Sequence, residues 1–163
     1  MNVIATLIER NEVHATGFDG GSLPAPPTLK IAIVTCMDAR LDPARALGLV
    51  PGDAHVIRNA GGIVTDDVIR SLSISQHKLG TEAIMVVQHT DCGLLTFTDE
   101  DFERAREQST GLRPAWSAGT FEDLETSVRD SLRAIRESPF VPRTDNLRGF
   151  VYEVEDGGLR EVT

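Results

Sequence analysis

The stretch that decides the fold of this chain reads Lys30-Ile31-Ala32-Ile33-Val34-Thr35-Cys36-Met37-Asp38-Ala39-Arg40. It begins as an apolar run, which is typical of a strand buried on both faces of a parallel sheet. A second run, Ala83 to Gln88, has the same character and leads into His89-Thr90-Asp91-Cys92. Side chains just beyond the carboxyl ends of adjacent parallel strands converge on one crevice, so we expect the two polar segments to meet.

Strand-like and helix-like patterns alternate around these two runs. Pro43 to Leu49 is predicted to be a short helix, and Ala54 to Arg58 is predicted to be a strand. Asp66 to Leu79 is a third element, a helix that Thr65 can cap and Gly80 can end. The resulting βαβαβ order predicts an α/β fold with a central, mostly parallel β-sheet flanked by helices and joined by right-handed crossovers.

Two further helices are predicted in the C-terminal half. Glu100 to Gln108 is strongly charged and is expected to lie on the surface. Thr120 to Glu137 carries apolar residues at helical spacing, beginning with Phe121. Thr120 and Asp123 resemble a capping box, which predicts that the second helix begins there.

The two ends of the chain are predicted to frame the core. Residues 2–16 have an amphipathic helical pattern, and a glycine- and proline-rich connector follows. Residues 1–27 would thus form an N-terminal arm ahead of an α/β core over 28–163. The arm helix can fold back on its own domain or pack on a partner, and its pattern favours neither. Strand patterns on both sides of a glycine turn near the C-terminus predict an edge hairpin.

The composition is that of a globular protein with one domain over residues 1–163. Hydrophobic residues make up 40% of the chain, and the net charge is −9. This acidity argues against nucleic acid or an anionic membrane surface as a partner. No apolar run approaches the length of a membrane span, and the first thirty residues lack the pattern of a secretory signal, so we expect a cytoplasmic protein.

Cys36 and Cys92 are the only two cysteines, and His89 lies three positions before the second. A reducing compartment disfavours a disulfide and leaves metal binding as the better use of two thiols. Two thiolates and one imidazole at the ends of adjacent strands leave a fourth tetrahedral position open, which is the arrangement of a catalytic zinc site. We therefore expect one Zn²⁺ per chain, held by Cys36, His89 and Cys92.

Three motifs in order carry a family resemblance: C-x-D-x-R from Cys36, Arg58-Asn59-Ala60-Gly61-Gly62, and H-x-x-C from His89. From about residue 31 to residue 93, and more loosely through 148–152, the chain resembles the β-class carbonic anhydrases. The resemblance implies a zinc lyase, carbonate dehydratase, that interconverts carbon dioxide and bicarbonate through a zinc-bound hydroxide. It also implies a homodimer or a dimer of dimers, with the N-terminal helix packed on the partner subunit.

Asp38 and Arg40 are the predicted catalytic pair. Alternate residues of an extended backbone share a side, which would place Cys36, Asp38 and Arg40 together and pack Met37 into the sheet. An arginine–carboxylate fork would hold Asp38 ionised. The resemblance implies that Asp38 orients the hydroxide, whereas in some members of the family this aspartate becomes a fourth zinc ligand. The sequence leaves both roles open, and it offers Arg58 beside Arg40 as a cation for the pocket.

Small residues are predicted to line a substrate pocket. Asn59, Ala60 and Gly61 can form a wall sized for a three-atom apolar substrate, although a glycine-rich turn also explains them. Gly93 can bring its N–H to the substrate or can simply begin a helix. Two rival functions keep the same ligands: hydrolysis of a sulfur analogue such as carbon disulfide, and a structural zinc module without activity. The Asp38–Arg40 pair argues against the structural module.

Overall fold

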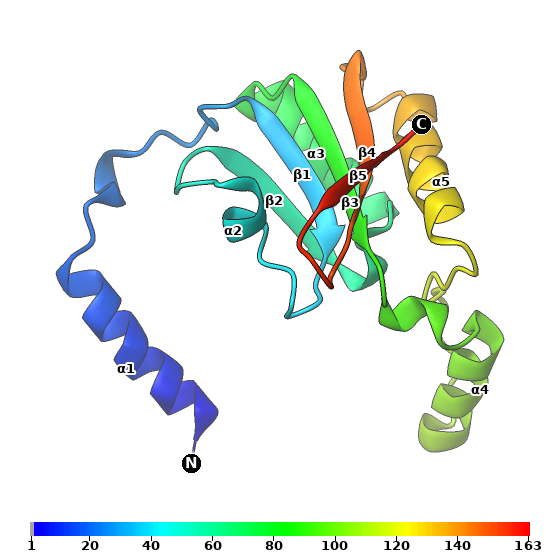
Figure 1. The fold of residues 1–163 in the computed structure, drawn as a ribbon. Helices are drawn as coiled ribbons and strands as arrows, with labels where there is room; N and C mark the ends of the chain where they lie inside the picture. The colour runs from blue at the N-terminus through cyan, green and yellow to red at the C-terminus, as the bar shows by residue number, and fades with distance from the viewer. Residues whose placement is uncertain (1) are drawn as a thin grey trace.

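The computed structural model describes residues 2–163, which contain one five-stranded sheet in the order β2-β1-β3-β4-β5 (Figure 1). The strands are β1 (Ile31–Cys36), β2 (Ala54–Asn59), β3 (Ala83–His89), β4 (Asn146–Tyr152) and β5 (Leu159–Val162). The first four run parallel, and β5 pairs antiparallel to β4. The predicted α/β fold with a mostly parallel sheet is confirmed, as is the C-terminal edge hairpin.

The register of the sheet brings the predicted site residues to one edge. Cys36, the last residue of β1, pairs with Asn59, the last residue of β2. Thr35 pairs with Val87 of β3, which continues to His89 before it ends. The carboxyl ends of three adjacent parallel strands therefore meet at one crevice.

Helices connect and cover the strands. They are α1 (Val3–Thr16), α2 (Pro43–Leu47), α3 (Asp66–Leu79), α4 (Asp99–Thr110) and α5 (Leu124–Glu137), with 3₁₀ turns η1 (Gly20–Ser22), η2 (Ala60–Gly62) and η3 (Gly93–Leu95). Thr65 caps α3 as predicted, because its side chain accepts a hydrogen bond from the Val68 N–H. Gly80 ends the same helix in the left-handed conformation, with φ of 74°.

The main core lies between one face of the sheet and the helices α3 and α5. Val34 of β1 and Val86 of β3 are fully buried there beside Leu72 of α3. Helix α5 approaches β4 closely because Gly149 has no side chain: a Cβ at that position would lie 2.5 Å from Cγ1 of Val128.

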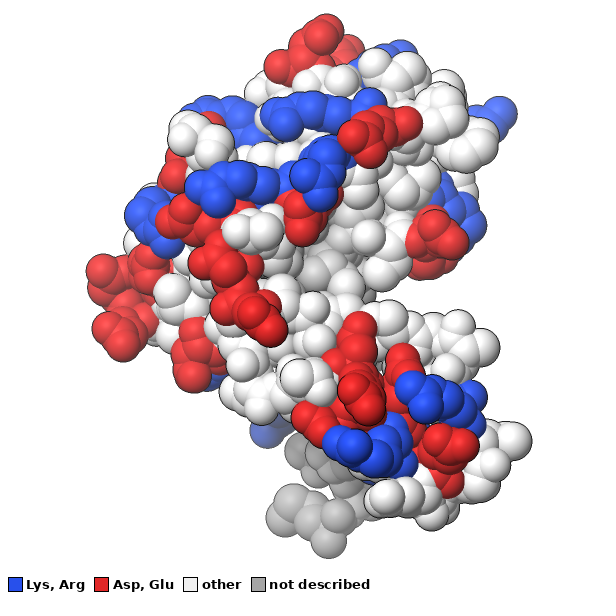
Figure 2. Space-filling view, turned by 90° about the vertical axis from the view of Figure 1, so that its right-hand side faces the viewer, with Lys and Arg blue, Asp and Glu red and all other residues white. Residues whose placement is uncertain are grey.

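The outer faces of α4 and α5 are polar. Figure 2 views the molecule from their side and shows acidic and basic side chains intermixed over it. Arg104 of α4 pairs with Asp101, and Arg133 of α5 pairs with Asp130, each pair spaced i,i+3. Exposed pairs of this kind add little stability. They do leave this face without a patch of a single charge sign.

Helix α5 begins later than the sequence pattern indicated. Asp123 is its N-cap and accepts a hydrogen bond from the Thr126 N–H at 2.8 Å. The Thr120 hydroxyl instead donates to Asp99 at the start of α4, and Phe121 lies before the helix, against a second and smaller apolar cluster. The predicted capping box at Thr120 is wrong, because Asp123 caps the helix and the Thr120 hydroxyl donates its hydrogen bond to Asp99.

Strand β1 ends at Cys36, so the predicted alternation does not continue beyond it. Met37 is 65% exposed, and Ala39 and Arg40 form a turn. The prediction that Met37 packs into the sheet is therefore wrong. The turn forms because the Asp38 carboxylate accepts a hydrogen bond from the Arg40 N–H at 2.8 Å, a local bond that competes with the strand ladder.

Helix α1 lies apart from the sheet, at the far end of the connector (Figure 1). Asn2 caps it, and none of its residues is buried. Its exposed apolar side chains are Val3, Ile4, Leu7, Ile8 and Val13. The arm helix therefore does not fold back on its own domain. Within residues 2–163, no helix is both long enough and apolar enough to cross a membrane.

Candidate metal centre

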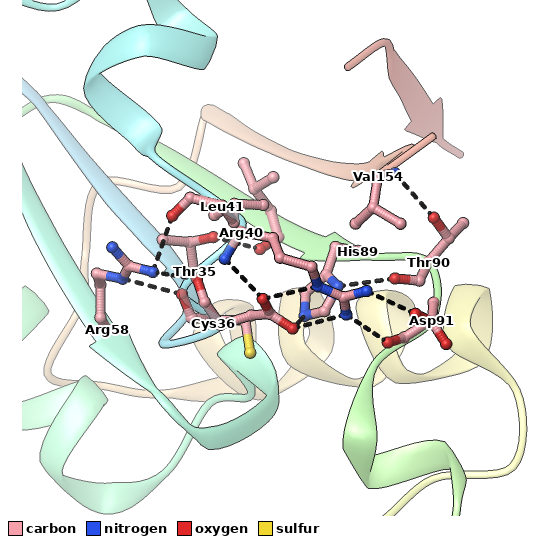
Figure 3. Close-up of polar contacts among 11 residues, drawn as sticks. Thr35, Cys36, Arg40, Leu41, Arg58, His89, Thr90, Asp91 and Val154 are labelled. Atoms are coloured by element: carbon pink, nitrogen blue, oxygen red, sulfur yellow. Dashed lines mark hydrogen bonds and ion pairs between the residues drawn. The ribbon is translucent and has the colours of Figure 1, made fainter. Parts of the chain in front are cut away.

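Three potential metal ligands meet at the carboxyl edge of the sheet. Cys36 ends β1, His89 ends β3, and Cys92 lies directly before the turn η3. One ligand atom from each residue lies within 4.8 Å of the others, and all three residues are buried. The two segments quoted from the sequence are thus brought together as predicted, with Cys36 and His89 side by side in Figure 3.

The hydrogen bonds of His89 leave one nitrogen free for a metal. Its Nδ1 lies 2.8 Å from the Thr90 carbonyl oxygen, which can only accept, so Nδ1 carries the proton. Nε2 is buried and has no hydrogen-bond partner within residues 2–163. An unpartnered buried nitrogen is costly unless a ligand satisfies it. Two sulfurs and one imidazole nitrogen in a compact group are a donor set that fits zinc.

The two thiols differ in their affinity for a proton. The neighbouring Cys92 thiol lowers the pKa of Cys36 against the effect of burial, and the nearby His89 ring acts in the same direction. The same contact, together with burial, raises the pKa of Cys92. Zinc binds cysteine as the thiolate, so a divalent cation bound here would displace the proton that the second thiol holds more tightly.

Asp38 and Arg40 form the predicted pair at the rim of this group. Arg40 donates from Nε to Oδ1 of Asp38 at 3.1 Å and from Nη2 to Oδ2 at 2.8 Å. The side-chain hydrogen bond from Arg40 holds the pKa of Asp38 well below its usual range. Oδ2 of Asp38 also lies 3.7 Å from Nε2 of His89, so this carboxylate borders the ligand group while it remains paired with Arg40.

Arg40 has a second partner, Asp91, on the loop that follows β3. Its Nη1 donates to Oδ2 of Asp91 at 2.6 Å, and its Nη2 donates to the Asp91 carbonyl oxygen at 2.9 Å (Figure 3). Asp91 lies between His89 and Cys92 and has a positive φ of 54°. The position of Asp91 between two ligands was the only sequence signal for this contact.

Arg58 borders the cleft beside the ligand group, with its guanidinium bound to backbone carbonyl oxygens. Its Nε donates to the Cys36 carbonyl oxygen at 2.9 Å, and its Nη2 donates to the carbonyl oxygens of Asp38 and Leu41 at 2.8 and 2.9 Å. Arg58 therefore holds the loop after β1 in shape. The register of β2 beside β1 creates this contact, and no local pattern in the sequence could have indicated it.

The predicted substrate residues all line one cleft beside the ligand group. Asn59, Ala60, Gly61 and Gly93 border a space of about 720 Å³ together with Cys36 and Cys92. Phe97, Phe102 and Trp116 form an aromatic wall on the side of α4, which the sequence analysis did not foresee. Only the return of the chain after α4 brings Trp116 within 5.9 Å of Phe102, measured between ring centroids.

The glycines of the wall permit a close approach to the ligands. Gly62 has φ of 62°, and a Cβ there would lie 2.7 Å from the backbone nitrogen of Cys36. Gly61 has φ of 79°, and its Cβ would lie 2.4 Å from Cδ1 of Leu94. Asn59 donates from Nδ2 to the Ile63 carbonyl oxygen, while its buried Oδ1 has no partner among the residues described.

Comparison with known proteins agrees with this arrangement. The family model described as carbonic anhydrase matches residues 31–159. Beta-carbonic anhydrase 1 of Mycobacterium tuberculosis is 56% identical over 163 residues, which cover 100% of this chain and 99% of that protein. A carbon disulfide hydrolase of an Acidianus species is 37% identical, over 83% of this chain and 78% of that protein.

A solved structure shows the same likeness over the whole fold. The crystal structure of a carbonic anhydrase from Streptococcus mutans superposes with a TM-score of 0.94 at 43% identity. The superposition covers 100% of this chain and 99% of the Streptococcus mutans chain. The matched range of the family model includes the three potential ligands as well as Asp38 and Arg40. The family resemblance drawn from the sequence is confirmed, and this chain belongs to the β-carbonic anhydrases, a family of zinc enzymes.

Proposed function

We propose that Cys36, His89 and Cys92 hold the catalytic zinc of an enzyme that interconverts carbon dioxide and bicarbonate. The observation that carries this proposal is the buried group of Cys36, His89 and Cys92, whose ligand atoms lie within 4.8 Å of one another and in which Nε2 of His89 has no hydrogen-bond partner among the residues described. Kinship with a protein named beta-carbonic anhydrase at 56% identity supports the reaction. Zinc bound by these three residues would lower the pKa of a bound water molecule and so supply a hydroxide nucleophile, although two thiolates would leave that pKa above the value of about 7 of a three-histidine site.

Asp38 is the residue that orients the attacking oxygen. Its Oδ2 borders the ligand group, 3.7 Å from Nε2 of His89, so it can accept a hydrogen bond from a water molecule there. Because Arg40 holds the pKa of Asp38 low, the carboxylate stays an acceptor throughout the neutral range. With its two oxygens on separate nitrogens of Arg40, the acceptor is also fixed in direction.

The wall over Asn59, Ala60 and Gly61 receives the substrate. Its short side chains leave room for a small linear molecule beside the ligand group. Gly93 presents its N–H beside Cys92, and a Cβ added there would meet nothing within 4 Å, so substrate can approach this backbone.

The test combines metal content with the rate of carbon dioxide hydration. The wild-type chain should bind about one zinc ion and hydrate carbon dioxide, whereas Cys36→Ser, His89→Ala and Cys92→Ser should each lose both properties. Ser109→Ala, on the exposed end of α4, is the matched control and should keep both. A ligand variant with full zinc and full rate would show that the assigned ligand set is wrong.

Hydrolysis of carbon disulfide is a second candidate for the same site. A relative named carbon disulfide hydrolase covers most of this chain, and the aromatic wall of Phe97, Phe102 and Trp116 suits an apolar molecule. One zinc-loaded preparation should be assayed with both substrates. Faster turnover of carbon disulfide would reassign the substrate, and zinc binding without either activity would leave a structural zinc module.

A homodimer is the assembly that the arm supports. Residues 2–27 of the arm extend from the core of residues 28–163, and α1 exposes a row of apolar side chains that a second copy can cover. Light scattering should give the mass of two chains, or of four if dimers pair. A fully active monomer at micromolar concentration would exclude this assembly.

A cytoplasmic location without nucleic acid or membrane partners completes the proposal. Two cysteines that must remain reduced to bind zinc suit a reducing compartment. The side of the molecule in Figure 2 mixes both charge signs and carries no basic patch of the kind that nucleic acid requires. Cell fractionation that recovered the chain outside the cytoplasm would contradict the location.

A further inference from the structure

Arg40 connects the two loops that carry the proposed zinc ligands. One edge of its guanidinium binds Asp38, on the loop after β1, through Nε and Nη2. The other edge binds Asp91, on the loop after β3, through Nη1 and Nη2. Figure 3 shows the contact of Arg40 with Asp91. The planar shape of the fork means that its orientation toward one carboxylate depends on the other.

Asp91 contributes to this contact without being buried itself. Its side chain is 74% exposed, and Arg40 is the only group within residues 2–163 that hydrogen-bonds its carboxylate. The backbone of Asp91 is left-handed, with φ of 54°, a conformation that aspartate and asparagine tolerate better than most residues. The turn therefore directs this side chain at Arg40 by backbone conformation and not by packing.

The contact between Asp91 and Arg40 matters because the Asp38 carboxylate can occupy either of two positions, paired with Arg40 or bound to the zinc. Its Oδ2 lies 3.7 Å from Nε2 of His89, and a carboxylate oxygen is itself a common zinc ligand. Arg40 is what holds the carboxylate in its paired position, yet the Arg40 side chain is 50% exposed. An exposed ion pair held from one side is weak, because a long side chain must be ordered to make it. A fork held at both edges is ordered in advance.

We propose that Asp91 is a positioning residue that fixes Arg40 against Asp38 and thereby keeps the Asp38 carboxylate away from the zinc. The inference rests on the proposed function, since it takes Cys36, His89 and Cys92 as the ligands. Loss of the Asp91 carboxylate frees Nη1 of Arg40 and leaves only the backbone carbonyl oxygen at position 91 to hold that edge of the guanidinium. Asp38 then leaves Arg40 more often and occupies the fourth ligand position, where it blocks substrate and adds a ligand.

The experiment measures zinc release to a chelator together with kcat and KM, in three zinc-loaded proteins. Asp91→Asn keeps a side-chain acceptor and the left-handed turn, whereas Asp91→Gly keeps the turn and the backbone carbonyl contact but has no side-chain acceptor. Zinc release should slow in Asp91→Asn and slow further, by about 10-fold, in Asp91→Gly, while kcat falls in the same order and KM changes little. If Asp91 had only a structural role, its loss would speed zinc release, because a loosened ligand loop releases zinc faster.

Two comparisons make the result decisive. Asp130→Asn removes a carboxylate from an exposed arginine pair on α5 and should leave both zinc release and kcat unchanged. In an Asp38→Asn background, Asp91→Gly should no longer slow zinc release, because an amide is a poor zinc ligand. Release at the wild-type rate or faster in both Asp91 variants would overturn the inference. A wild-type chain that binds no zinc would instead overturn the proposed function.

Discussion

Gly62→Ala is expected to damage the zinc site through the backbone alone. Gly62 has φ of 62°, and an added Cβ would lie 2.7 Å from the backbone nitrogen of Cys36 and 2.9 Å from the carbonyl carbon of Thr35. Both atoms belong to β1, which is paired with a parallel strand on each side. They cannot move without breaking ladder hydrogen bonds, so the strain must either distort the η2 turn or break the end of β1 at Cys36, its last residue.

The magnitude follows from two separate costs. A left-handed conformation costs an alanine about 1–2 kcal/mol. Overpacking against a fixed neighbour adds about 1–3 kcal/mol. The free energy of unfolding should therefore fall by about 2–5 kcal/mol. Gly80→Ala is the matched control, since Gly80 has φ of 74° with nothing within 4 Å of an added Cβ. The free energy of unfolding of Gly80→Ala should therefore fall only by the cost of the left-handed conformation, about 1–2 kcal/mol.

The assay is urea unfolding of both variants at one protein concentration, because subunit association would change the apparent stability. Zinc content is measured in the same samples. Gly62→Ala should lose zinc, since displacement of Cys36 disturbs the ligand group, whereas Gly80→Ala should keep about one ion per chain. Equal destabilisation by the two variants, with zinc retained in both, would refute the argument from close approach.

Three further outcomes are expected. Asp123→Ala should lower the free energy of unfolding by about 1 kcal/mol in urea titrations, because it removes the cap of α5. A hydrogen bond from Ser117 lowers the pKa of Asp99, so Asp99→Asn should be less stable than wild type at pH 7, with a difference that fades as the pH falls below about 3.9. Leu7→Ser combined with Ile8→Ser should shift the mass measured by light scattering toward a single chain, because both side chains are exposed on α1.

Much of the site could be predicted from the sequence, because apolar runs indicate where buried strands begin and end. The apolar runs before Cys36 and His89 mark two buried strands, and parallel strands in an open sheet must end at one crevice. The pairing of Asp38 with Arg40 was also predicted, although the reason given for it was wrong. A local turn joins the two residues, and strand alternation does not reach them.

What the sequence by itself determined was the order of elements, the ligand types and their convergence, since apolar periodicity and residue chemistry are properties of short segments. The tertiary structure alone decided which groups meet across long separations. Asp99 binds Thr120, Asp91 binds Arg40, and Arg58 binds the carbonyl oxygens of the loop after Cys36. Each of these contacts depends on strand register or on the return of a loop. Their free energy arises only once distant segments are held together by the buried core, so no short segment could reveal them.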